Sequence, residues 1–313
     1  MSRCLYCYGE LDAGQNDFHP ACARKFFGTK DVPRLEYSLS EIDALAARII
    51  GERTSLTGVQ PKLSLNLMKH QGGGRLTIVG LWGDFICKPQ SSYFSALPEV
   101  EDLTMHLAEI ARIDVVPHTL MRMADGTLCY LTRRIDRTPT GGKVAMEDLC
   151  QLSGRLTEHK YMGSYERVAK TVAKFSSMPK LDVANIMEVV LLSWLTGNND
   201  MHLKNFSLYE TATGDVRLTP VYDLLNVAIV NPADDEELAL TLNGRKKRIT
   251  RADFIAAGIS MGLFPVTVER MIEKFARLRP RMEAMIDKSM LGAGMKNSYR
   301  NLLCERLARI AAR

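Results

Sequence analysis

Long apolar runs are absent from this sequence of 313 residues. A membrane-spanning helix needs roughly 18 or more apolar residues in a row, and the longest apolar stretch, Ile186–Leu195, is interrupted by Glu188. The first residues also lack the apolar core of a signal peptide. We therefore expect a cytoplasmic protein that does not associate with a membrane, in which Ile186–Leu195 forms a buried helix.

Charge of one sign is not in excess either. The sequence has 41 basic and 36 acidic side chains, for a net charge of +5, and lacks the basic surplus that is typical of nucleic-acid-binding domains. We expect no direct DNA binding. The basic run Arg245–Arg248 is interpreted as a solvated turn, although such a run could instead contact tRNA or an acidic partner.

A disulfide framework is also missing, because the seven cysteines are odd in number and scattered. This usage favours a reducing compartment. One group stands apart: Cys4, Cys7, His19 and Cys22 follow the spacing C-x2-C-x11-H-x2-C. Two pairs of soft ligands suit tetrahedral Zn²⁺. The alternative is four unrelated residues near a terminus, and we expect no direct catalytic role for them in either case.

The order of the predicted elements divides the chain into a small Cys/His module over 1–30, a strand-rich N-lobe over 31–140 and a helix-rich C-lobe over 141–313. Alternating apolar residues predict antiparallel strands in the N-lobe, with one helix over 98–113 between them. Further helices are predicted over 37–50, 145–153, 164–177, 182–196 and from Thr250 onward, and a hairpin over 205–222. The predicted fold is α+β and bilobal, with a small antiparallel-sheet N-lobe and a larger helical C-lobe.

The segment after the buried helix carries the strongest chemical signal. Gly197 is expected to end that helix, and Asp200 is followed by Asn205 in the spacing D-x4-N. Protein kinases space a catalytic Asp and a magnesium-binding Asn in this way. Lys204 could neutralise charge on a transferred phosphoryl group, and the hairpin brings Asp223 to the place of a second metal ligand. The alternative is a polar loop that caps a helix end.

Glycine-rich phosphate motifs are absent. The segment Thr54–Lys62 contains a single glycine and matches neither G-x-x-x-x-G-K-[ST] nor G-x-G-x-x-G. Lys88, at the end of an apolar strand, is the candidate for binding phosphate. Its ion-pair partner would be Glu101 or Glu99 in the helix that follows.

Several segments, in this order along the chain, resemble the HipA-type toxin kinases. The matching segments are Ser55–Lys62, Phe85–Pro89, Arg133–Arg137, Glu147–Gln151, Gly197–Ser207 and Pro220–Asp223. The resemblance covers residues from about 50 to 250 and implies a bilobal kinase-like fold. It also implies an ATP- and Mg²⁺-dependent serine/threonine protein kinase that serves as the toxin of a bacterial toxin–antitoxin system.

The resemblance also implies roles for individual residues. Asp200 and Lys204 would be catalytic, with Asp200 as the proton acceptor, and Asn205 and Asp223 would bind the metal. Autophosphorylation would fall on Ser55 or Thr57. Nucleotide contacts would come from Thr57, Gly58, Val59, Gln60, Pro61, Lys62, Lys88, Arg133, Arg134, Ile135, His202, Leu203, Asn205, Tyr222 and Asp223.

Two features depart from the family pattern. Arg133 occupies a position that is often acidic, so adenine recognition there would have to use backbone groups. The chain is also short, and the cysteine module stands where longer relatives carry an N-terminal subdomain. The likeness is therefore nearest to HipT, the short kinase of three-component systems.

That likeness implies two antitoxin partners, one a HipB-like helix-turn-helix protein and one a small HipS-like protein. The implied substrate is an aminoacyl-tRNA synthetase or another translation protein. Two other functions stay open from the residues alone: a small-molecule phosphotransferase on a kinase-like fold, and a non-catalytic regulatory binding protein.

Overall fold

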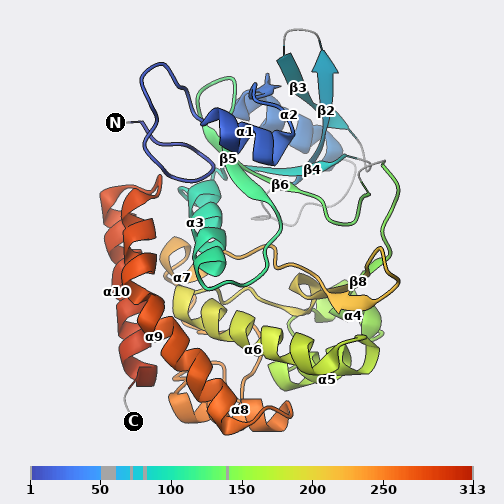
Figure 1. Ribbon diagram of the computed structural model, residues 1–313, viewed down its shortest axis with the longest axis vertical. Helices are drawn as coiled ribbons and strands as arrows, with labels where there is room; N and C mark the ends of the chain where they lie inside the picture. The colour runs from blue at the N-terminus through green and yellow to red at the C-terminus, as the bar shows by residue number, and fades with distance from the viewer. Residues whose placement is uncertain (1, 51–60, 71–72, 80–82, 139–140, 312–313) are drawn as a thin grey trace. The chain divides into compact units, whose positions relative to one another are not determined.

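The computed structural model describes residues 2–50, 61–70, 73–79, 83–138 and 141–311. The chain divides into two compact units, whose helices and strands are drawn in Figure 1. The first, here called the sheet unit, comprises Met1–Leu103, Val116–Ile135 and Lys288–Leu291. The second, called the helical unit, comprises Thr104–Val115, Asp136–Asp287 and Gly292–Arg313. The three-part division expected from the sequence stays a prediction.

The sheet unit is built on a six-stranded sheet in the order β1-β3-β2-β4-β6-β5. Only the β1–β3 pair is parallel, and the other pairs are antiparallel. The elements of this unit are α1 (Pro20–Phe27), β1 (Arg34–Leu35), α2 (Leu39–Ile50), β2 (Leu63–His70), β3 (Gly73–Val79), β4 (Phe85–Pro89), the start of α3 (Leu97–Ile110), β5 (His118–Arg122) and β6 (Leu128–Arg133).

Alternation of apolar residues sets the face of this sheet that is buried. Leu63 and Leu65 of β2 are buried while Ser64 between them is partly exposed, as expected for side chains that alternate across a strand. Leu76 on β3 lies opposite Leu67 and is fully buried. A hairpin turn at Asp125-Gly126 joins β5 and β6, and Gly126 supplies its left-handed φ of 85°.

The helical unit surrounds α6 (Pro179–Thr196), whose residues from Val189 to Thr196 are all buried. Trp194 packs edge-on against Phe254 at 5.4 Å between ring centroids. The other elements are β7 (Met146–Asp148), α4 (Leu149–Leu152), η1 (Thr157–His159), α5 (Tyr165–Phe175), η2 (Leu203–Asn205), β8 (Ser207–Glu210), β9 (Val216–Leu218), α7 (Val227–Val230), α8 (Arg251–Ser260), α9 (Pro265–Lys288) and α10 (Ala293–Ala311).

The helix predicted over 145–153 is wrong in its first half. Met146–Asp148 form strand β7, which pairs antiparallel with β8, and only Leu149–Leu152 are helical. The sequence spacing of this stretch fits a helix, but the backbone groups of Glu147 are taken up by pairing with Leu208. Tertiary pairing here overrides local propensity. Asp148 then caps α4 by accepting a hydrogen bond from the Gln151 N–H at 3.0 Å.

The basic run at 245–248 is largely neutralised by neighbouring carboxylates. Lys246 pairs with Glu236 at 2.9 Å, Lys247 pairs with Asp235, and Arg245 lies 3.7 Å from Asp253. The predicted start of the following helix is confirmed, because the Asp253 carboxylate accepts hydrogen bonds from the N–H and the hydroxyl of Thr250. The run is therefore part of a turn that is held by ion pairs.

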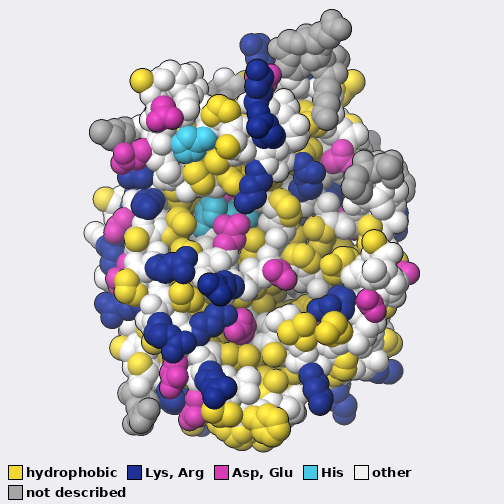
Figure 2. Space-filling model, in the orientation of Figure 1, with side chains coloured by type: hydrophobic (Ala, Val, Ile, Leu, Met, Phe, Trp, Pro, Cys, Tyr) yellow, Lys and Arg dark blue, Asp and Glu magenta, His cyan; other side chains and the backbone are white. Residues whose placement is uncertain are grey.

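Charges of both signs also mix on the surface. Figure 2 shows Lys and Arg side chains gathered over α9 and α10 on this face, with Asp and Glu among them. Arg279 pairs with Glu283 within α9, and Arg309 pairs with Glu305 within α10.

Among the helices that the structure describes, none has the length and apolar character that crossing a membrane would require.

Gly197 ends α6 as predicted, in the left-handed conformation with φ 77°. The carbonyl of Gly197 accepts a hydrogen bond from the Ala228 N–H at 3.1 Å. A Cβ at this position would lie 2.5 Å from Asn226 Oδ1 and 2.6 Å from Leu302 Cδ2. Both the backbone angle and the space therefore require glycine.

We expect Gly197→Ala to lower the free energy of unfolding by about 3 kcal/mol, from left-handed strain together with overpacking. Gly214→Ala is the matched control, because Gly214 has φ 84° and nothing within 4 Å of an added Cβ. That variant should lose only about 1 kcal/mol, from the strain alone. Denaturant titration of both variants measures the difference, and equal losses would contradict the close approach at Gly197.

Candidate active site

The D-x4-N segment is fixed from within by its own side chains. The Asn205 Nδ2 donates a hydrogen bond to the backbone carbonyl of Asp200 at 2.9 Å. The N–H of Asp200 donates to Asn198 Oδ1 at 3.2 Å. Asn199 Nδ2 donates to the Glu236 carbonyl at 3.0 Å. The backbone on both sides of Asp200 is thus held by amide side chains.

The Asp200 carboxylate is partly exposed, with 46% of its side chain accessible. Tyr161 donates its hydroxyl hydrogen to Asp200 Oδ1 at 2.5 Å, and His202 Nε2 lies 4.0 Å from the same oxygen. The Tyr161 ring packs edge-on against His202, with centroids 5.0 Å apart. An accessible carboxylate held in one orientation is what a proton acceptor requires.

Asp223 lies in the same electrostatic environment as Asp200. Burial lowers the pKa of His202, while the carboxylates of Asp200 and Asp223 oppose this effect. Burial also raises the pKa of Tyr161, as do Asp200 and Asp223. Asp223 itself has a left-handed φ of 61°, a conformation that costs a non-glycine residue roughly 1–3 kcal/mol and is often found at functional sites.

Tyr222 ties the hairpin to the D-x4-N segment. Its hydroxyl donates to the Lys204 carbonyl at 3.1 Å and lies 2.6 Å from the Ser207 hydroxyl. Burial raises the pKa of Tyr222, so the phenol stays protonated. This contact explains how the hairpin brings the neighbouring Asp223 to the segment.

Lys204 forms an ion pair that was not predicted. Its ammonium lies 2.6 Å from Asp148 Oδ2, while Asp148 also caps α4. In the sequence, Asp148 stands out only as part of a segment that resembles the HipA-type kinases, and Tyr161 carries no signal of a role. Both residues lie far from Asp200 in the sequence, and no spacing signal joins them to it.

In the sheet unit, Lys88 pairs with Glu101. The ammonium lies 2.6 Å from Glu101 Oε1, both side chains are buried, and the ammonium lies 5.5 Å from the centroid of the Tyr130 ring. The partner left open by the sequence is therefore Glu101. For Glu99, burial raises the pKa, and its Oε2 has no hydrogen-bond partner among the described residues.

The residues at the end of β6 and just after it make structural contacts of their own, and the side chain of Arg133 is engaged in two of them. The Arg133 guanidinium donates to the Phe26 carbonyl and lies 5.4 Å from the centroid of the Phe85 ring. The Arg134 N–H donates to the Asp84 carbonyl at 2.8 Å, and Ile135 is partly exposed. The Arg133 side chain thus has structural contacts of its own.

The predicted site residues fall into two groups, one in each unit. The sheet unit contains Pro61, Lys62, Lys88, Arg133, Arg134 and Ile135, and the helical unit contains Asp200, His202, Leu203, Lys204, Asn205, Tyr222 and Asp223. Ser55, Thr57, Gly58, Val59 and Gln60 lie outside the described residues.

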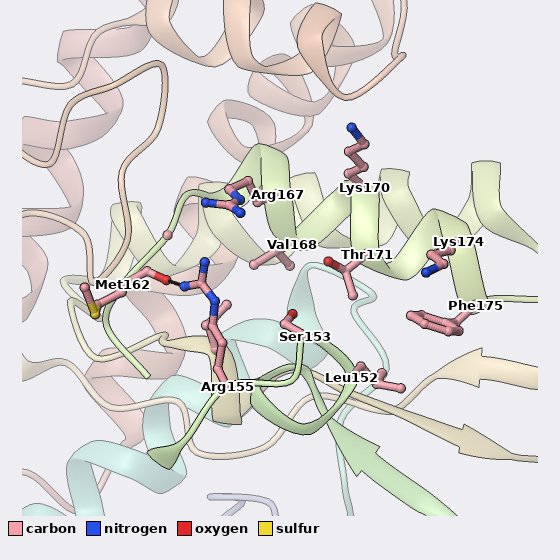
Figure 3. A pocket seen from close by; sticks show the side chains of 12 residues that line it. Leu152, Ser153, Arg155, Met162, Arg167, Val168, Lys170, Thr171, Lys174 and Phe175 are labelled. Carbon is pink, nitrogen blue, oxygen red and sulfur yellow. Dashed lines mark hydrogen bonds between the residues drawn. The ribbon is translucent and has the colours of Figure 1, made fainter. Parts of the chain in front are cut away.

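A cavity of about 450 Å³ lies beside α5 in the helical unit (Figure 3). Arg155, whose guanidinium donates to the Met162 carbonyl, lines it together with residues of α4 and α5. Leu203 also lines the cavity, whereas Asp200 and Asn205 do not. The cavity therefore borders the D-x4-N segment without containing its polar side chains.

Comparison with known proteins places this geometry in a family. The model of the HipA-like C-terminal domain matches residues 54–286. "Putative kinase Y4dM" of Sinorhizobium fredii is 35% identical over 209 residues, which are 62% of this chain and 50% of that protein. "Putative kinase Y4mE" of the same organism is 30% identical over 230 residues, 69% of this chain and 53% of that protein. The chain thus spans about half the length of these two relatives.

Solved structures share the fold. A chain of the Shewanella oneidensis toxin–antitoxin complex of HipA, HipB and operator DNA has a TM-score of 0.70 at 21% identity, covering 96% of this chain and 80% of that one. The proinflammatory kinase CtkA of Helicobacter pylori has a TM-score of 0.53 at 13% identity, covering 79% and 93%. The expected α+β, kinase-like fold is confirmed.

The fold is therefore of the kinase-like class. Within that class, the chain belongs to the HipA-like C-terminal domain family, because the family model matches well over half of its length. The resemblance stated from the sequence is thereby confirmed at the level of the family.

The buried pair in the sheet unit gives a test of the geometry. Lys88→Met should lower the free energy of unfolding by about 3 kcal/mol, because the buried Glu101 carboxylate loses its ammonium partner. Glu101→Leu should cause a similar loss, because the buried Lys88 ammonium then loses its carboxylate partner. The double variant should lose clearly less than the sum, since it removes both charges.

Chemical denaturation of the three variants measures this coupling. The exposed pair Arg75–Glu36, at 3.3 Å in the same unit, is the control. Its coupling should stay below about 1 kcal/mol. Additive losses at Lys88 and Glu101 would contradict a direct buried pair.

Proposed function

We propose that this chain is an ATP-dependent serine/threonine protein kinase that acts as the toxin of a bacterial toxin–antitoxin system. The observation that carries the proposal is the D-x4-N segment as folded, with Asn205 holding the Asp200 backbone and Tyr161 orienting the Asp200 carboxylate. Membership of the HipA-like family and the putative kinases among the relatives support it.

In this proposal Asp200 accepts the proton of the substrate hydroxyl. The hydroxyl oxygen forms the new bond to phosphorus, and the bond to the leaving diphosphate oxygen breaks. Asp200 is suited to this because its carboxylate is accessible while its backbone is fixed. Lys204, paired with Asp148 at 2.6 Å, holds a positive charge beside the segment, where it can offset negative charge on the phosphoryl oxygens.

The donor atoms of the site fit Mg²⁺, which prefers oxygen ligands. The Nδ2 of Asn205 is used in its bond to the Asp200 carbonyl, so Oδ1 is the amide atom that can bind a cation. Asp223 supplies a carboxylate from the end of the hairpin. When bound, Mg²⁺–ATP supplies the phosphoryl group. Asn205 and Asp223 would hold the metal.

The nucleotide-binding residues of the sheet unit fit the same proposal. The Lys88–Glu101 pair matches the lysine–glutamate pair that kinases use to position phosphates. The segment after β6, from Arg133 to Ile135, would contact adenine through its backbone, because the Arg133 side chain is occupied elsewhere. Thr57–Lys62 would contact the phosphates, and His202, Leu203 and Tyr222 would complete the nucleotide site.

Partners and substrate follow from the likeness alone. The Shewanella oneidensis complex contains HipA, HipB and operator DNA, which supports a HipB-like antitoxin as a partner of this chain in the cytoplasm. A small HipS-like antitoxin is the second proposed partner. The proposed substrate is an aminoacyl-tRNA synthetase or another translation protein.

The principal test replaces Asp200 by Gln. We expect phosphoryl transfer to fall by about 10²–10⁴-fold or more, because the proton acceptor is lost. Growth arrest on expression should be lost in parallel. The control is Asp215→Asn, which changes an exposed carboxylate in the β8–β9 turn and should leave both readouts unchanged.

Transfer can be measured with labelled ATP, and phosphoproteomics of cells that express each variant identifies the substrate. Near-normal transfer by Asp200→Gln would remove the proposed role of Asp200. Transfer to a small molecule but to no protein would favour a small-molecule phosphotransferase. If neither the wild type nor Asp200→Gln transfers phosphate and both still bind the partner, a regulatory binding protein would be favoured.

Incubation of the purified protein with ATP should add one phosphate in the segment that contains Ser55 and Thr57. Mass spectrometry of the wild type, of Ser55→Ala and of Thr57→Ala would locate the modified hydroxyl. Asp200→Gln incubated in the same way is the control and should stay unmodified. Phosphate at neither residue in an active enzyme would contradict autophosphorylation at this segment.

A further inference from the structure

The N-terminal segment forms a tight turn that brings Cys4 and Cys7 together. The Tyr8 N–H donates to the Cys4 carbonyl at 2.9 Å, and the Cys4 N–H donates to the Gly9 carbonyl at 2.8 Å. Tyr8 adopts a left-handed φ of 58° at the centre of this turn. The backbone of this segment therefore folds back on itself, and Cys4 and Cys7 belong to one short loop.

The second pair comes from the start of α1. His19 is the N-cap residue of this helix, Pro20 is its first residue, and Cys22 lies in its first turn. The His19 Nδ1 lies 3.5 Å from Cys7 Sγ and 3.7 Å from Cys22 Sγ. One ligand atom from each of Cys4, Cys7, His19 and Cys22 lies within 4.8 Å of the other three.

These separations fit a tetrahedral metal site. Zinc binds sulfur at about 2.3 Å and histidine nitrogen at about 2.0 Å, so the edges of a regular tetrahedron around it are roughly 3.5–3.8 Å long. Both measured contacts of His19 Nδ1 fall in this range. Four protein ligands leave no open position, which is typical of a structural site rather than a catalytic one.

The far side of the His19 ring is oriented as in metal sites. Its Nε2 lies 2.9 Å from the Glu10 carbonyl, which can only accept, so Nε2 carries a proton and Nδ1 is the ring nitrogen that faces the sulfurs. A hydrogen bond of this kind to the second ring nitrogen is usual for a metal-bound histidine. A Cβ at Gly9 would lie 3.3 Å from both Cys7 Sγ and His19 Cε1, so the loop is also closely packed here.

We propose that Cys4, Cys7, His19 and Cys22 bind one Zn²⁺ in a structural site that fastens the N-terminal segment to the sheet unit. Binding converts the cysteine thiols to thiolates and releases their protons, with no change of oxidation state. The proposal does not depend on the kinase activity, and its test requires none.

The fastened segment makes several contacts with the sheet unit. The Leu5 carbonyl accepts hydrogen bonds from the Leu120 N–H and the Thr119 hydroxyl at 3.3 and 3.2 Å. Tyr8, next to Cys7, donates to Asp102 Oδ2 at 2.6 Å in α3, beside Glu101. Phe26 of α1 packs on Phe85 of β4, with ring centroids 5.8 Å apart. The zinc site would therefore stabilise the two elements that carry Lys88 and Glu101.

Elemental analysis of the full chain, purified without chelators, should find about one zinc per protein. Cys22→Ser should lose most of this zinc. The control is Cys304→Ser, which changes a cysteine of similar partial burial in the helical unit and should keep it. An unchanged zinc content in Cys22→Ser, or a wild type that binds no zinc after reconstitution, would overturn the proposal.

A second readout uses the wild type, so that it does not depend on the folding of Cys22→Ser. Replacement of the metal by Co²⁺ should give the intense visible bands of a tetrahedral thiolate site, and a thiol-modifying reagent should release one equivalent of metal. Chelation should also lower the thermal midpoint of wild type and of Cys304→Ser. A disulfide between two of the module cysteines in the freshly purified protein, with no metal, would instead show that the cluster is a redox pair.

Discussion

The left-handed conformation of Gly197 is the constraint on which the rest of the helical unit depends. This residue ends the buried helix α6, and its carbonyl accepts the N–H of Ala228. The space where a side chain would lie is filled by Asn226 and Leu302, from segments far along the chain. Asn226 in turn caps α7 through the Ile229 N–H. A single glycine thus ends the central helix, leaves room for Asn226 and Leu302 to pack against its backbone, and turns the chain toward Asp200.

The parts of the site that were predictable are local in sequence. The D-x4-N spacing and the glycine before it lie within nine residues of one another, and a loop of this length constrains the positions of its own side chains. The strand that ends at Lys88 and the helix that carries Glu101 could likewise be recognised from apolar spacing. The choice between Glu99 and Glu101 could not be made from the sequence, because it depends on which face of α3 meets Lys88. In the structure that face is the one with Glu101.

The parts that were missed depend on contacts between distant segments. Tyr161 reaches Asp200 across 39 positions, and Asp148 reaches Lys204 across 56. Strand β7 was read as helix because its pairing with β8 is invisible in its own sequence. The same pairing explains Asp148: it places the residue at the junction of β7 and α4, where one carboxylate both caps a helix and binds the Lys204 ammonium. An error in one strand and an unforeseen ion pair therefore have one physical origin.

Arg133 contacts α1, the helix that begins within the cysteine module. Arg133 donates to the carbonyl of Phe26, at the end of α1, and its guanidinium lies over Phe85, on which Phe26 also packs. An acidic side chain at this position would face the Phe26 carbonyl oxygen with another acceptor, and both would lose hydrogen bonding. Arg133 therefore joins the helix that begins within the cysteine module to strands β4 and β6 of the same unit.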